Sequence, residues 1–290
     1  MAGNFWRSSH CQQWLLDKQD LMRERNNDLK LICEEDYQKV MIFFANFIQG
    51  LGEAMKVRQQ VVATATVFFR RFYAKNSLKS IDPLLMCPTA LYLAAKVDEF
   101  GVLSNSRLIQ ACQVLVKNKF CYAFNQPTEF SYRINHVWEC EFYLLELMDC
   151  CLIVFHPYRP LQQYVTDLCS STDDAQLLQV AWRIINDTYR TDIPLLYPPY
   201  MIALSALHMA CVINQKEAAK NWFAELAIDM EKIMEISKQI ISLYELWKNY
   251  DETKEIKAIL QSLPKPVVSR PPSQGPNDGI QNNDPHVSQA

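Results

Sequence analysis

Residues 84–97 read LLMCPTALYLAAKV, and residues 199–212 read PYMIALSALHMACV. Both stretches carry a proline near the start and are apolar almost all round, which is typical of helices enclosed by other helices. The proline-led segments that begin at Pro88 and Pro199 are 111 residues apart. This spacing favours a duplicated helical unit, although two similar core helices also fit an unduplicated all-α protein.

Apolar residues at helical spacing predict five helices in each half of the chain. In the first half they are expected at residues 34–51, 58–74, 84–97, 104–117 and 131–148. In the second half they are expected at residues 157–168, 175–189, 199–213, 221–226 and 229–247. The predicted fold class is therefore all-α, built from two five-helix repeats.

The predicted organisation has five parts. They are an N-terminal segment with a helix over 9–25 (1–30), the first repeat (31–150), the second repeat (151–250), a C-terminal helix (251–263) and a tail (264–290). The tail holds six of the fourteen prolines together with Ser, Gln and Asn. This composition predicts disorder.

Charge and glycine content exclude several classes of protein. The 29 basic and 32 acidic residues give a net charge of −3, so direct binding to nucleic acid is not expected. Six glycines are too few for the turns of a hairpin-rich β protein. The uncharged run Leu195–Ile213 is broken by Pro198 and Pro199, which favours an interior helix over a membrane span.

No cofactor or metal site is predicted. The ten cysteines show no CxxC spacing, and the opening residues MAGNFWRSSH lack the pattern of a secretory signal, so reduced thiols are expected. The five histidines show no metal-ligand spacing. A magnesium-dependent helical enzyme is the alternative from another class, because acidic pairs occur at Asp173-Asp174 and Asn186-Asp187. The third aspartate of a DDxxD motif is absent, and acids at a helix start have an ordinary role there.

Lys96 is the one charge within the apolar helix predicted over residues 84–97. An ammonium group buried without a partner would cost several kcal/mol. Lys96 must therefore reach either water, at the C-terminal end of its helix, or a binding partner. The residues alone favour neither role.

Two motifs resemble the cyclin family. LAAKVDEF at 93–100 closes the third helix of the first repeat, and WECEFYLLELMDC at 138–150 forms the fifth. The resemblance runs from residue 1 to about residue 263 and implies the cyclin box fold. It also implies a non-catalytic subunit that activates a cyclin-dependent kinase by holding the αC helix of the kinase inward.

The resemblance implies a kinase-binding site on the first repeat. Lys96 and Glu139 match the family's lysine and glutamate that bond to the kinase backbone near αC. Asp98 and Glu99 are expected to meet arginines of the kinase.

A second contact with the kinase is expected at the N-terminus. It would include Phe5, Trp6 and the 9–25 helix that carries Trp14. Simple packing of these aromatic residues on the first repeat is the alternative.

The resemblance is to transcriptional cyclins, because the chain contains no RxxL sequence of a mitotic destruction box. It implies a nuclear protein that partners the kinase and further subunits of the Mediator kinase module. Ala95, Asp98 and Trp138 depart from the family pattern, which leaves open whether the chain activates the kinase or only binds it. A helical-repeat scaffold and a general transcription factor of the TFIIB type also have the predicted all-α character.

Overall fold

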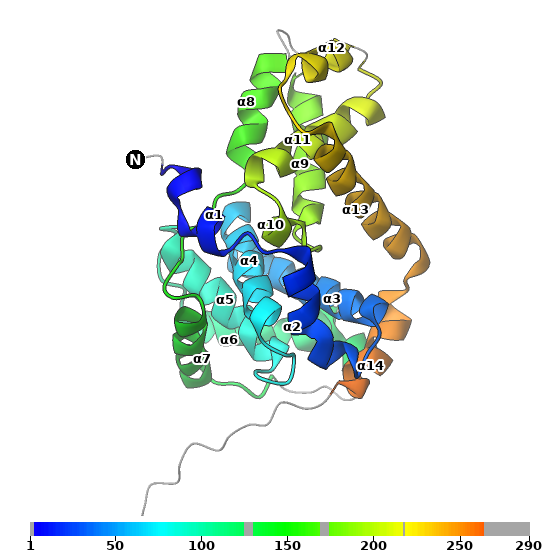
Figure 1. Ribbon diagram of the computed structural model, residues 1–290. Helices are drawn as coiled ribbons and strands as arrows, with labels where there is room; N and C mark the ends of the chain where they lie inside the picture. Colours follow the sequence, from blue (N-terminus) through cyan, green and yellow to red (C-terminus); the bar gives the residue numbers. More distant parts are fainter. Residues whose placement is uncertain (1–2, 125–129, 169–173, 217, 264–290) are drawn as a thin grey trace, which may run out of the picture.

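The computed structural model describes residues 3–124, 130–168, 174–216 and 218–263. Helices account for the regular structure of these residues, with no strand among them, which confirms the predicted all-α class (Figure 1). The predicted disordered tail, residues 264–290, and Asp173 lie outside the described residues. Within these ranges no helix is both long and apolar enough to cross a bilayer.

The first repeat contains the five predicted helices. They are α3 (Glu34–Met55), α4 (Gln59–Lys75), α5 (Pro83–Val97), α6 (Asn105–Val114) and α7 (Ile134–Leu147). The short helical segments η2 (Leu115–Lys119) and η3 (Cys121–Ala123) follow α6. Helix α5 begins where Asp82 accepts a hydrogen bond from the Leu84 amide at 2.9 Å, directly before a proline at the first helical position.

The second repeat contains α8 (Tyr158–Leu168), α9 (Asp174–Thr188), α11 (Pro199–Ile213), α12 (Ala218–Glu225) and α13 (Met230–Asn249). A one-turn helix, α10 (Ile193–Leu196), precedes α11 and was not expected from the sequence. Helix α14 (Glu252–Ser262) then returns to the first repeat, where Ile256 is buried in the core and Glu255 binds Lys39 at 2.9 Å.

The central helices α5 and α11 match in length and in the geometry of their ends. Each has 15 residues and begins with a proline, and each is followed closely by a residue in the left-handed conformation, Glu99 or Gln215, both with φ of 53°. The register of the repeat is therefore 116 residues, from Pro83 to Pro199. The expected register of 111 is wrong, because Pro88 lies inside α5 and not at its start.

The N-terminal region corrects the prediction of one helix over residues 9–25. After the 3₁₀ turn η1 (Phe5–Arg7), two helices form, α1 (Ser9–Gln13) and α2 (Lys18–Leu29). The chain breaks between them because Trp14 turns into the core and the Leu16 amide donates to the carbonyl of Leu195 at 2.8 Å. Asp17 then caps α2 by accepting from the Gln19 amide at 2.7 Å.

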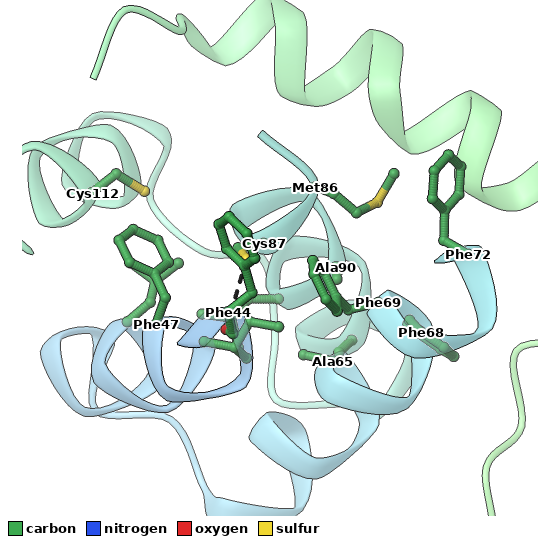
Figure 2. Close-up of a cluster of buried hydrophobic side chains, with 14 of the residues drawn as sticks. Phe44, Phe47, Ala65, Phe68, Phe69, Phe72, Met86, Cys87, Ala90 and Cys112 are labelled. Carbon is green, nitrogen blue, oxygen red and sulfur yellow. Dashed lines mark hydrogen bonds between the residues drawn. The ribbon is translucent and has the colours of Figure 1, made fainter. Parts of the chain in front are cut away.

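Aromatic side chains of α3 and α4 fill the core of the first repeat against α5 (Figure 2). The rings of Phe44 and Phe69 lie 5.8 Å apart, and the Cys87 thiol donates to the Phe44 carbonyl at 3.8 Å. Each fully buried phenylalanine contributes about 1.5–3 kcal/mol relative to an exposed one. This dense core fixes α5, and therefore the position of Lys96 in its last turn.

Three elements meet at Asp192, in the segment between α9 and α10. Its carboxylate accepts two hydrogen bonds from Arg25 of α2, both at 2.6 Å, and one from Arg70 of α4 at 3.0 Å. Burial alone would raise the pKa of Asp192, but the attraction and hydrogen bonds of Arg25, together with Arg70, lower it to about 2. This ion cluster ties the N-terminal helix and both repeats together.

Candidate partner-binding site

Lys96 forms an ion pair with Glu141, so the last turn of α5 is joined to α7. The Lys96 ammonium also lies 4.7 Å from the ring centroid of Tyr92, one turn earlier on α5. The side chain of Lys96 remains partly exposed, whereas that of Glu141 is buried. Lys96 therefore reaches the surface, which was one of the two environments expected from the sequence, and it also has a partner within its own chain.

The glutamate that the structure places beside Lys96 is Glu141, whereas the resemblance had matched Glu139. Glu139 is exposed on α7, whereas Glu141 lies on the apolar stripe of that helix and faces α5. The buried positions of α7 are Val137, Cys140, Glu141 and Leu144. A charged residue within such a stripe requires a partner, and this was the signal in the sequence that marked Glu141. The structure shows that its partner is Lys96.

Asp98 and Glu99, the two acidic residues expected to contact the kinase, follow α5 and have different environments. The Asp98 carboxylate accepts from Gln60 Nε2 at 3.2 Å, and its carbonyl accepts from Arg58 Nη2 at 3.0 Å, so Asp98 is directed toward the start of α4. Burial raises the pKa of Asp98, although hydrogen bonds with Thr64 and Gln60 oppose the rise. Glu99 is exposed and remains a candidate contact.

Exposed aromatic side chains lie on α7 and directly after α5, the two helices that the ion pair joins. Trp138 and Phe142 are one helical turn apart on α7, and Trp138 is also one turn from Glu141. Phe142 is 72% exposed, and Phe100 after α5 is also exposed. Phe142 and Phe100 were not predicted as contacts from the sequence. The signal that could have identified them is a large aromatic residue outside the apolar stripe of its helix, which indicates an exposed ring. We call Phe100, Trp138 and Phe142 the aromatic rim.

The N-terminal aromatic residues have different environments. Trp6 is 60% exposed, and its ring centroid lies 5.7 Å from that of Tyr200, while the Phe5 ring lies 5.5 Å from that of Phe155. These four residues help to line a hollow of about 1000 Å³ between the N-terminus and the second repeat. Phe5 and Trp6 therefore remain candidate contacts.

Trp14 is not accessible to a partner. It is only 2% exposed, and the cations of Arg71 and Lys75 lie 4.9 and 4.3 Å from its ring centroid. The prediction that Trp14 contacts a kinase is therefore corrected to packing on α4. The physical reason is that the apolar ring of Trp14 is buried in the core of the first repeat, against the cations of Arg71 and Lys75.

No group of three or more potential metal ligands of the His, Cys, Asp and Glu types occurs within the described ranges. Of the acidic groups considered for magnesium, Asp187 accepts from the Tyr244 hydroxyl at 3.1 Å and pairs with Arg190 at 3.5 Å. Asn186 accepts from the Tyr158 hydroxyl at 2.8 Å. Both side chains therefore have structural contacts in the second repeat.

Known protein families and relatives match most of the chain. Residues 12–153 match "Cyclin, N-terminal domain", and residues 156–248 match "Cyclin C-terminal domain". Cyclin-C of Drosophila melanogaster is 61% identical over 274 residues, which cover 94% of this chain and 100% of that protein. Cyclin-C of Rattus norvegicus is also 61% identical, over 287 residues that cover 97% of this chain and 98% of that protein.

Solved structures share the arrangement of helices. A chain of the yeast TFIIK (Kin28/Ccl1/Tfb3) complex matches with a TM-score of 0.63 and 24% identity, covering 82% of this chain and 99% of that chain. A chain of the Chaetomium thermophilum CAK complex matches with a TM-score of 0.66 and 21% identity, covering 89% and 87% respectively. At these identities the likeness concerns the fold alone.

Proposed function

Because the chain belongs to the cyclin family, we propose that it binds and allosterically activates the cyclin-dependent kinase of the Mediator kinase module. The family resemblance seen in the motifs of α5 and α7 is confirmed by the matches. The 61% identity to Cyclin-C proteins over nearly the whole chain supports the assignment to this kinase. The chain would act in the nucleus, without chemistry of its own, in transcription by RNA polymerase II.

The observation that carries the proposal is the Lys96–Glu141 ion pair, which joins the two helices that also carry or precede the exposed residues of the aromatic rim. An ammonium has three N–H donors and a carboxylate has two acceptor oxygens, so each group keeps hydrogen-bonding capacity after pairing. The pair can therefore donate to a carbonyl and accept from an amide of one partner backbone. The rim would cover these bonds with apolar contact and exclude water from them.

The kinase element that fits this site is its αC helix. Holding αC inward completes the lysine–glutamate pair of the kinase and orders its activation segment. Glu99 would contact a kinase arginine at the edge of the site. Phe5 and Trp6 would provide the second contact, or would bind another subunit of the kinase module.

The test compares charge-reversed variants of the full chain with the Mediator-associated kinase. Lys96→Glu and Glu141→Lys each replace the ion pair with two like charges, and loss of one partner of a charge pair that a bound protein covers typically costs about 2–5 kcal/mol of binding. We expect each change to weaken capture of the kinase by at least roughly thirtyfold and to abolish its stimulation. Glu139→Lys, on the exposed face of the same helix, is the matched control and should bind within about twofold of wild type.

Circular dichroism verifies that every variant is folded. Equal binding by folded wild type, Lys96→Glu and Glu141→Lys would refute this site. Loss of binding in Glu139→Lys but not in Glu141→Lys would restore the glutamate chosen from the sequence. Binding by the wild type without stimulation would refute activation and favour a scaffold that only binds the kinase.

A further inference from the structure

Helix α5 ends in a turn that holds a glutamate in a conformation favoured by glycine. Glu99 has φ of 53°, in the left-handed region that other side chains rarely adopt. The backbone closes the turn, because the amides of Phe100 and Gly101 both donate to the Ala95 carbonyl, at 3.0 and 3.2 Å. Backbone strain of this kind is found at functional sites, where the neighbouring structure holds the strained residue in place.

Side chains at the start of α4 hold this turn. Arg58, the residue before α4, donates from Nη2 to the Asp98 carbonyl at 3.0 Å, and Gln60 Nε2 donates to the Asp98 carboxylate at 3.2 Å. The Arg58 guanidinium also lies 5.9 Å from the ring centroid of Phe100. Arg58 therefore contacts the residues on both sides of Glu99, a backbone carbonyl before it and a ring after it.

The backbone alone defines the shape of the turn but does not attach it to another helix. The same ending occurs after α11, where Gln215 also has φ of 53° and the Lys216 amide donates to the Cys211 carbonyl at 3.0 Å. These backbone bonds all lie within one helix and the turn that follows it. The contacts of Arg58 are different, because they join the turn after α5 to the start of α4 and so fix the direction of the Glu99 side chain.

We infer that Arg58 is a positioning residue for kinase binding, which holds Glu99 so that its carboxylate faces the partner. The inference rests on the proposed function, in which Glu99 contacts an arginine of the kinase. A guanidinium pairs most strongly with a carboxylate through two parallel hydrogen bonds, which require a defined geometry. A carboxylate on an unattached turn would bind more weakly, because binding would have to order the turn. Arg58 thus acts through Glu99 and does not itself contact the kinase.

The test is a double-mutant cycle in the full chain, with capture of the Mediator-associated kinase as the readout. We expect Arg58→Ala to weaken capture by roughly fivefold or more, and Glu99→Gln to weaken it at least as much. In the Glu99→Gln background, Arg58→Ala should change capture by less than about twofold, because the carboxylate that Arg58 positions is absent. Arg58→Lys keeps a donor for the Asp98 carbonyl and should bind within about twofold of wild type.

A matched control and a measurement without the kinase separate positioning from general destabilisation. Arg107 is also exposed and donates to a backbone carbonyl of the first repeat, that of Ala54, at 3.3 Å. Arg107→Ala should therefore capture the kinase within about twofold of wild type. In the free chain, hydrogen exchange measured by mass spectrometry should be at least roughly threefold faster over residues 97–103 in Arg58→Ala, and unchanged in α6.

Equal capture by wild type and Arg58→Ala, or by wild type and Glu99→Gln, would overturn the inference while the proposed function stands. An undiminished effect of Arg58→Ala in the Glu99→Gln background would also overturn it, because Arg58 would then contact the kinase directly. Unchanged hydrogen exchange over residues 97–103 would show that Arg58 does not hold the turn and would overturn it as well. Failure of the wild type to capture the kinase would instead refute the proposed function, and this inference with it.

Discussion

Replacement of Asp192 by asparagine should destabilise the whole molecule. The Asp192 carboxylate lies between two buried guanidinium groups, Arg25 at 2.6 Å and Arg70 at 3.0 Å. The amide of asparagine has nearly the same shape but no charge. The change therefore removes the nearest counter-ion of two buried cations while it hardly alters the packing.

Two considerations give the size of the effect. Removing one partner of a buried ion pair typically costs about 3–5 kcal/mol of the free energy of unfolding. The pKa of Asp192, about 2 in the fold against 3.8 for a free aspartate, gives roughly 2 kcal/mol for protonation, because one pKa unit is worth about 1.4 kcal/mol. We expect Asp192→Asn to lose about 2–5 kcal/mol.

The same pKa fixes the sign of the pH dependence. The carboxyl group of Asp192 binds a proton less tightly in the folded protein than in the unfolded chain. Its contribution to the free energy of unfolding is therefore complete above about pH 4. It is lost as the pH falls toward about 2. Asp192→Asn should abolish this part of the acid-induced loss of stability.

Urea unfolding monitored by circular dichroism measures the loss. Asp20→Asn is the matched control, because Asp20 forms an exposed ion pair with Arg23 at 2.9 Å and should change stability by no more than about 1 kcal/mol. If Asp192→Asn were no less stable than Asp20→Asn, the cluster would not join the two repeats as described.

Two further predictions concern the packing of the N-terminal segment and the protonation of the buried histidines. Trp14→Ala should lower the free energy of unfolding by about 3–5 kcal/mol, whereas Trp6→Ala should change it by no more than about 0.5 kcal/mol; equal urea midpoints for these variants would contradict the burial of Trp14. Burial, with the charge of Arg71, lowers the pKa of His10 and of His156 from 6.5 to about 3, so stability that is complete above about pH 6.5 should fall as the pH decreases toward 3. Urea midpoints measured across this range should show a weaker dependence on pH in His156→Gln, and an unchanged dependence would refute a neutral buried His156.

The helices of both repeats could be predicted from the sequence because each contains a sustained apolar stripe, as α13 does at Ile233, Ile236 and Ile240. The break after α1 could not be predicted in this way. The break depends on the hydrogen bond that the Leu16 amide donates to the Leu195 carbonyl, and on the burial of Trp14. Both are contacts between parts of the chain that are distant in sequence. Local periodicity contains no information about such contacts.

The order of the residues by itself determines the helical class, the two repeats and the family motifs. It also shows that the Lys96 ammonium must reach water or a partner. The packed fold was required to show that the partner of Lys96 is Glu141 and not Glu139, and that Asp98 is directed toward α4 while Glu99 is exposed. An apolar pattern reports how much surface a helix must bury, whereas an ion pair depends on which faces of two helices meet. That orientation is fixed by the packing of the aromatic core around α5.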